Sequence, residues 1–181
     1  GAPAFLYVAR RHQGALRSPL TGWMGHARPF AFEQGYAPAE GMGRWLFGTP
    51  PILALAALEA GLDGYEGVSV EALRARSMAL TDLFVAEVEA VGDTGLILAS
   101  PREAARRGAQ VSFRHPDGYA IVAALIDAGV VGDFRAPDVL RFGFAPLYVT
   151  EAQVREAVRR LGQVLETEAW REPRFQVRPA V

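Results

Sequence analysis

Hydrophobic positions recur at helical spacing in two long stretches of the chain. From Ser69 to about Val91, apolar residues return every three, four or seven positions and form one face, and Ser69 is expected to cap the helix. A second amphipathic stretch follows Thr150, which is expected to form a capping box with Gln153 for a helix to about Glu168. The pattern therefore predicts two long helices, each with one face against a core.

Shorter apolar runs bounded by turn residues are typical of buried strands. Helices are also expected over residues 51–60, closed by Gly61, and over residues 117–128. Ser100 and Glu103 indicate a further helix start. Strands alternating with helices favour an α/β or α+β architecture. The predicted strands are residues 5–9, 96–99, 110–114, 130–134 and 139–144.

A domain boundary is predicted near residue 92, where the long helix gives way to shorter alternating elements. At 1.5 Å per residue that helix would be about 35 Å long, enough to bridge two domains. The sequence thus predicts three parts. Residues 1–68 belong to one domain, residues 69–91 form a linking helix, and residues 92–181 form a small C-terminal domain.

Residues 21–63 hold the first candidate chemistry. Trp23 lies between glycines, which let the backbone approach another group closely, and Thr49 precedes a helix whose N-terminus favours a phosphate. Each residue also has a simpler interpretation. A lone Trp is more often a core or interface residue, a lone histidine such as His26 is more often structural, and Thr-Pro is a routine helix start.

Arg141 is the second candidate, because it is a charge in the middle of an apolar strand. Its planar guanidinium matches a carboxylate through two parallel hydrogen bonds. The residues alone favour a ligand carboxylate and a salt bridge to a core Asp or Glu about equally.

Composition excludes several classes of function. The formal net charge is −1 and the basic residues are spread along the chain, so nothing indicates a nucleic-acid surface. No apolar run reaches the roughly 18–20 residues of a membrane span, and a cytoplasmic protein is expected. There is no cysteine, and three scattered histidines show no metal-ligand spacing, so no metal site is expected. All 19 basic residues are arginine, so the chain has no lysine to form a Schiff base with a cofactor.

Residues 21–63, together with GDFR at 132–135 and VSFRHP at 111–116, closely resemble kynureninases, which are pyridoxal-phosphate hydrolases. The resemblance covers nearly the whole chain. It implies the fold of a fold-type-I pyridoxal-phosphate enzyme, similar to aspartate aminotransferase. Residues 1–68 would then be the C-terminal part of its large cofactor-binding domain. The implied reaction is hydrolysis of L-kynurenine to anthranilate and L-alanine in tryptophan degradation.

The resemblance also accounts for the missing lysine. In kynureninases the cofactor lysine lies a few residues before a segment that matches residues 1–5. The chain is therefore expected to be the C-terminal portion, starting just after that lysine, without a catalytic residue or turnover of its own. Because the lysine handles the proton transfers in this family, His26 is given no catalytic role.

Site residues follow by position within the family pattern. The resemblance implies that Trp23 and Thr49 bind the cofactor and that Arg141 holds the substrate's α-carboxylate. Gly48 and Met24 would border the substrate, and Met24 stands where relatives often have Phe. Thr49 replaces an Asn of relatives that prefer 3-hydroxykynurenine, which indicates a preference for kynurenine itself.

The resemblance further implies a homodimer with shared active sites and a small-molecule substrate, with no nucleic-acid or membrane partner. Two alternatives remain open. One is another fold-type-I enzyme, such as an aminotransferase or a cysteine desulfurase. The other is a naturally lysine-free domain that acts as a non-catalytic interaction module.

Overall fold

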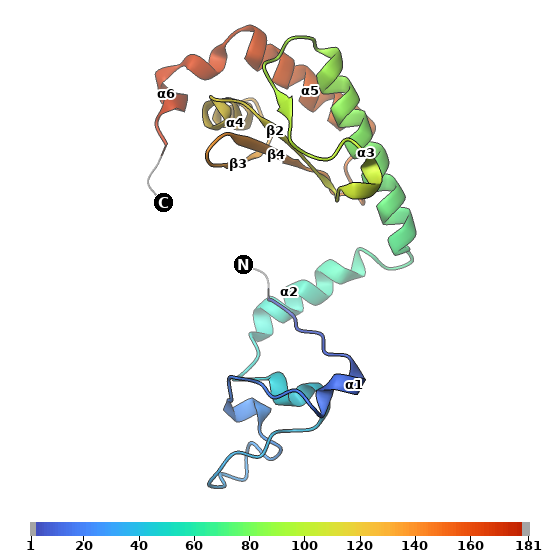
Figure 1. Ribbon diagram of the computed structural model, residues 1–181, viewed down its shortest axis with the longest axis vertical. Coiled ribbons are helices and arrows are strands. Elements are labelled where there is room, and N and C mark those ends of the chain that lie inside the picture. Colours follow the sequence, from blue (N-terminus) through green and yellow to red (C-terminus); the bar gives the residue numbers. More distant parts are fainter. Residues whose placement is uncertain (1–2, 179–181) are drawn as a thin grey trace. The chain divides into compact units, whose positions relative to one another are not determined.

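The computed structural model describes residues 3–178, which form two compact units that divide between Glu66 and Gly67 (Figure 1). Residues 1 and 2 lie outside the described residues. They belong to the segment 1–5 that resembles the stretch following the cofactor lysine of kynureninases. The described part of the first unit contains two helices. An irregular segment with two 3-10 turns connects them. The elements of this unit are α1 (Arg10–Gln13), the 3-10 turns Trp23–Gly25 and Gly41–Trp45, and α2 (Ile52–Asp63).

Two predictions in the first unit are wrong. Residues 5–9 do not form a strand, because a strand needs a hydrogen-bonded neighbour and the described part of this unit contains no named strand to pair with. Phe5 and Tyr7 are consequently exposed. Gly61 does not end the helix either. α2 continues to Asp63, because glycine costs only about 1 kcal/mol relative to alanine inside a helix.

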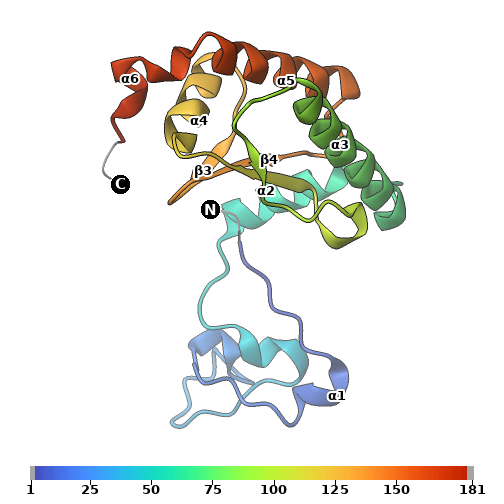
Figure 2. The same cartoon turned by 45° about the horizontal axis from the view of Figure 1, so that its top comes forward.

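The second unit is a four-stranded antiparallel sheet with helices on one side. The strand order is β1-β2-β4-β3, so the two longest strands lie in the middle. Figure 2 shows α3, α4 and α5 gathered on the same side of the strands. The elements are α3 (Val70–Ala90), β1 (Ile97–Leu98), β2 (Gln110–Arg114), α4 (Gly118–Asp127), β3 (Asp133–Arg135), β4 (Val139–Gly143), α5 (Glu151–Glu166) and α6 (Pro173–Gln176).

Alternate residues of the central strands build the core of the second unit. Val111 and Phe113 on β2, with Leu140 and Phe142 on β4, are at most 5% exposed. Phe84 of α3 packs onto them, with ring centroids 6.1 Å from Phe113 and 5.0 Å from Phe142. Because side chains alternate along a strand, the intervening residues point to the opposite face of the sheet.

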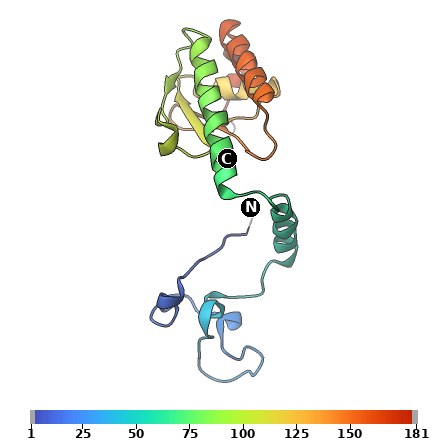
Figure 3. The same cartoon turned by 90° about the vertical axis from the view of Figure 1, so that its right-hand side faces the viewer.

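Both long helices begin where the sequence predicts. The Ser69 hydroxyl accepts a hydrogen bond from the backbone N–H of Ala72 at 3.1 Å, and Thr150 and Gln153 form the complete capping box of α5. Figure 3 shows α3 and α5 side by side. Both helices belong to the second unit, which begins at Gly67. Within residues 3–178, no helix has both the length and the apolar character needed to cross a bilayer.

The predicted helix start at Ser100 is wrong. The Ser100 hydroxyl accepts a hydrogen bond from the backbone N–H of Ser112 at 2.9 Å, so the side chain that would cap a helix is bonded to the sheet. Only a 3-10 turn, Ala104–Arg106, forms in this loop. The Ser100 hydroxyl thus bonds to a residue distant in sequence and not to the backbone of a following helix.

A buried arginine fastens that loop to α3. The side chain of Arg107 is 3% exposed, and it donates hydrogen bonds to the carbonyls of Pro101 and Arg102 and to the Thr81 hydroxyl. It also forms an ion pair with Asp82. A buried charge needs partners of this kind, and here each guanidinium nitrogen has one.

We expect Phe84→Ala to destabilise the second unit by about 3–5 kcal/mol, because it leaves a cavity where Phe113, Phe142 and Phe144 meet α3. Urea unfolding of the 181-residue chain, followed by circular dichroism, measures the change. Val131 is 84% exposed, so the matched control Val131→Ala should change the free energy of unfolding by only about 0.5 kcal/mol or less. Equal losses in both variants would contradict this account of the core.

Candidate functional site

The predicted site residues fall into two groups. Trp23, Met24, Gly48 and Thr49 lie in the first unit, and Arg141 lies in the second.

The structure brings the two predicted segments of the first unit together. The backbone N–H of Met24 donates to the carbonyl of Phe47 at 3.3 Å. Any Cβ at Gly22 would overlap that same carbonyl, so only glycine permits the approach. The Trp23–Met24 turn therefore lies against the residue that precedes Gly48.

Trp23 keeps part of its ring accessible. Its indole N–H donates to the carbonyl of Pro29, and its ring centroid lies 5.4 Å from that of Phe30 in an edge-to-face arrangement. The residue is nonetheless 50% exposed. Because the N–H already has a partner, what Trp23 offers a ligand is the aromatic surface.

His26 stabilises the loop beside Trp23. Its Nδ1 accepts a hydrogen bond from the backbone N–H of Arg28 at 3.0 Å, and its ring lies 5.6 Å from that of Tyr36. The Tyr36 hydroxyl in turn donates to the carbonyl of Gly25 at 3.0 Å. These contacts give His26 a structural role in the described loop, in line with the simpler interpretation of the sequence.

Thr49 is exposed and lies shortly before α2. No side chain caps the N-terminus of α2 among the described residues. A helix start without a cap leaves backbone N–H groups that suit an anion, and a threonine hydroxyl adds a further donor. A Cβ at Gly48 would meet nothing within 4 Å, so the turn is open at this point.

Arg141 lies on the sheet face opposite the helices. Its strand register pairs it with Ser112 of β2 and with Asp133 of β3. Its Nε donates to Asp133 Oδ2 at 2.9 Å, and its Nη2 donates to the same oxygen. The guanidinium thus forms a salt bridge, one of the two interpretations left open above, but its side chain remains 29% exposed and is not a core group.

Asp133 was given no role in the sequence analysis. The hydrogen bond from Arg141 holds the pKa of its carboxyl below the usual value, and the nearby charge of Arg135 adds to this effect. Asp133 is the first residue of its strand, within the GDFR sequence. Its place beside Phe134, in a predicted strand that is otherwise apolar or glycine, is the signal that could have identified it.

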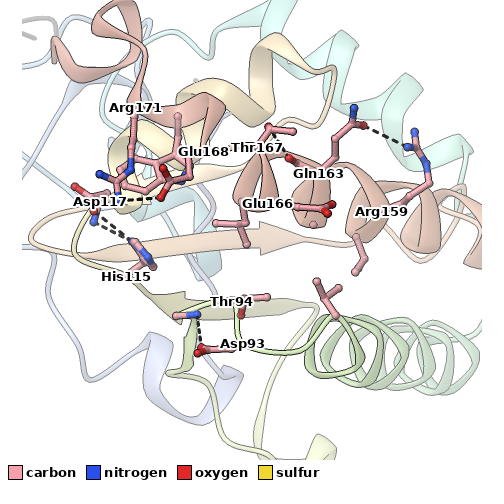
Figure 4. Close-up of a pocket in the computed structure, with 16 residues that line it drawn as sticks. Asp93, Thr94, His115, Asp117, Arg159, Gln163, Glu166, Thr167, Glu168 and Arg171 are labelled. Carbon is pink, nitrogen blue, oxygen red and sulfur yellow. Dashed lines mark hydrogen bonds and ion pairs between the residues drawn. The ribbon is translucent and has the colours of Figure 1, made fainter.

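The hollow in Figure 4, of about 1280 Å³ in the second unit, contains none of the predicted site residues. Some of its polar groups bond to one another. His115 Nδ1 accepts from the backbone N–H of Asp117 at 3.0 Å, and Arg171 pairs with Glu168 at 3.0 Å. No three His, Cys, Asp or Glu side chains of the described residues are grouped to hold a metal ion.

Sequence comparison extends over the whole chain. A family model described as the kynureninase C-terminal domain matches residues 73–161. Kynureninases of Burkholderia mallei (strain SAVP1) and Pseudomonas fluorescens are 48% and 47% identical over 182 aligned positions, which cover 100% of this chain. The chain spans 44% of the length of each of these relatives.

Solved structures agree on the fold. The apo cysteine desulfurase of Thermococcus onnurineus NA1 matches with a TM-score of 0.73 at 17% identity, over 89% of this chain and 42% of that one. A C-DES variant with glycine covalently linked to its PLP cofactor matches with a TM-score of 0.67 at 22% identity, over 86% and 40%. The fold is that of fold-type-I pyridoxal-phosphate enzymes, which confirms the prediction from sequence. Residues 73–161 thus match the kynureninase C-terminal domain, and the chain is similar to kynureninases along its whole length.

Proposed function

We propose that the protein containing this chain hydrolyses L-kynurenine to anthranilate and L-alanine, as a step of tryptophan degradation. The observation that carries the proposal is 48% identity to a kynureninase along the entire chain. The activity is a proposal about the whole protein, because the chain spans 44% of that relative. The cofactor lysine is proposed to lie outside this chain, which has no lysine.

Pyridoxal phosphate is the proposed cofactor, and the first unit has groups that suit it. The accessible ring surface of Trp23 offers a stacking partner for an aromatic ring. The exposed Thr49 and the uncapped start of α2 suit a phosphate group. When bound, such a cofactor supplies a ring that withdraws electrons from the reacting carbon of an amino acid.

Arg141 is proposed to hold the α-carboxylate of the substrate. It is partly exposed on the open face of the sheet, and a guanidinium binds a carboxylate through two parallel hydrogen bonds. Its task is to orient the substrate. Met24 and Gly48 are proposed to border the substrate, and Thr49 in place of Asn supports a preference for kynurenine over 3-hydroxykynurenine.

The remaining features are proposed from the sequence pattern and from the family resemblance. They are a homodimer with shared active sites, a cytoplasmic location, and a division into residues 1–68, 69–91 and 92–181. The exposed apolar side chains of α2 support further contacts for this helix in the intact protein. These side chains are Ile52, Leu53, Leu55, Leu58 and Leu62.

Another fold-type-I activity is the alternative, because both solved neighbours named above share the fold and one is a cysteine desulfurase. We expect the full-length protein with pyridoxal phosphate to convert L-kynurenine to equimolar anthranilate and L-alanine, followed by anthranilate fluorescence. The rate should be lower with 3-hydroxykynurenine. Release of sulfur from cysteine, or amino transfer to a keto acid, without anthranilate would contradict the proposal.

We expect Arg141→Ala in the full-length protein to raise the KM for L-kynurenine about a hundredfold, because the carboxylate loses its charged partner. The absorbance of the bound cofactor should not change, since the first unit carries the proposed cofactor contacts. Arg155→Ala is the matched control, because Arg155 forms an exposed ion pair with Glu87 at 3.1 Å. Wild-type kinetics in Arg141→Ala would contradict its role.

A further inference from the structure

A polar row crosses the three longest strands on the sheet face opposite the helices. Strand register places Ser112, Arg141 and Asp133 next to one another on β2, β4 and β3. Within this row, Asp133 makes the closest polar contacts of the Arg141 side chain. Two strands therefore cooperate to hold one guanidinium, and the acid comes from a different strand than the arginine.

The contact uses one edge of the guanidinium. Nε and Nη2 of Arg141 both donate to Oδ2 of Asp133. A guanidinium has five N–H donors in one plane, so the second N–H of Nη2 and the two of Nη1 remain. Nη1 and Nη2 form the end-on edge, which matches the two oxygens of a carboxylate. Asp133 thus fills the side edge and leaves the end-on edge for a second carboxylate.

Charge near this row stays positive. Arg135 Nη2 lies 3.4 Å from Asp133 Oδ2, so one carboxylate is shared by two guanidinium groups. The Asp133 carboxyl is ionised at neutral pH, as an aspartate ordinarily is, and the hydrogen bond from Arg141 lowers its pKa further. With two positive charges and one negative, the face still attracts an anion.

Holding the arginine has a physical benefit for binding. A long, flexible side chain that is ordered only when its ligand arrives loses rotamer entropy at that moment, which weakens affinity. An arginine already ordered by a neighbouring acid has lost that freedom during folding. Here the ordering contacts are the hydrogen bonds from Nε and Nη2 of Arg141 to Asp133.

We propose that Asp133 is a positioning residue that holds the Nε edge of Arg141 and so presents the end-on edge of the guanidinium to the carboxylate of an amino-acid ligand. This inference rests on the proposed function of Arg141. It adds a residue, Asp133, and an orientation to that function.

The test compares two ligands on the full-length enzyme. Asp133→Asn should raise the KM for L-kynurenine about tenfold. The inhibition constant of kynuramine, which is kynurenine without the α-carboxylate, should not change. In an Arg141→Ala background, Asp133→Asn should have no further effect, because it acts through Arg141. Glu89→Gln is the matched control, since Glu89 forms an exposed two-bond ion pair with Arg102 away from the row.

Three outcomes would overturn the inference. Equal weakening of kynurenine and kynuramine would mean a general structural role for Asp133. Tighter binding of kynurenine by Asp133→Asn would mean that the acid competes with the ligand. Losses that add in the double variant would mean independent action. If Arg141→Ala leaves the KM for L-kynurenine unchanged, the proposed function of Arg141 is wrong. If Arg141→Ala raises that KM but Asp133→Asn does not, only the proposed role of Asp133 is wrong.

The pair itself is tested on the full-length protein. A pH titration of side-chain carboxyl carbons by NMR should give Asp133 a pKa below its usual 3.8, and Arg141→Ala should return it toward that value. Because the folded-state pKa is lowered, the stability due to this pair is present above pH 3.8 and is lost as the pH falls through the folded pKa. A normal pKa for Asp133 in a folded chain would show that the pair does not form in solution.

Discussion

The alternation of side chains along β2 and β4 is the constraint on which the second unit depends. It directs Val111 and Leu140 into the core and their neighbours Ser112 and Arg141 to the opposite face. Shifting either strand by one residue would bury a guanidinium and expose the apolar set, which makes the register costly to change. The packing that stabilises the sheet therefore also fixes where the candidate carboxylate partner lies.

Two arginines of this unit show how burial decides what a charge does. Arg107 is buried, and its guanidinium nitrogens are bonded to carbonyls, to the Thr81 hydroxyl and to Asp82. Such a group holds a loop in place and has little capacity for a ligand. Arg141 is partly exposed and bonded along one edge only. The sequence singles out Arg141 as a charge within an apolar strand and does not indicate that Arg107 is buried, because that burial arises from tertiary packing.

Local signals were predictable, and long-range pairings were not. Ser69, Thr150 and Gln153 cap helices within their own first turns, so the starts of α3 and α5 could be read from spacing. Ser100 carries a similar cap signal, yet its hydroxyl bonds to Ser112 across the sheet. The Asp133–Arg141 pair depends on strand order and register in the same way. Residues 5–9 show the converse, because in this apolar run without a partner strand Phe5, Leu6 and Tyr7 remain exposed.

Fold and sequence support different parts of the functional argument. Solved neighbours at 17% and 22% identity share the fold, and a shared fold does not specify a reaction. Arg141 does not specify one either, because every α-amino acid carries the carboxylate that a guanidinium would hold. Discrimination among amino acids must therefore come from groups that contact the rest of the ligand. In this chain the predicted groups of that kind are Met24 and Gly48, which the close approach of Gly22 to Phe47 brings onto adjoining segments of the first unit.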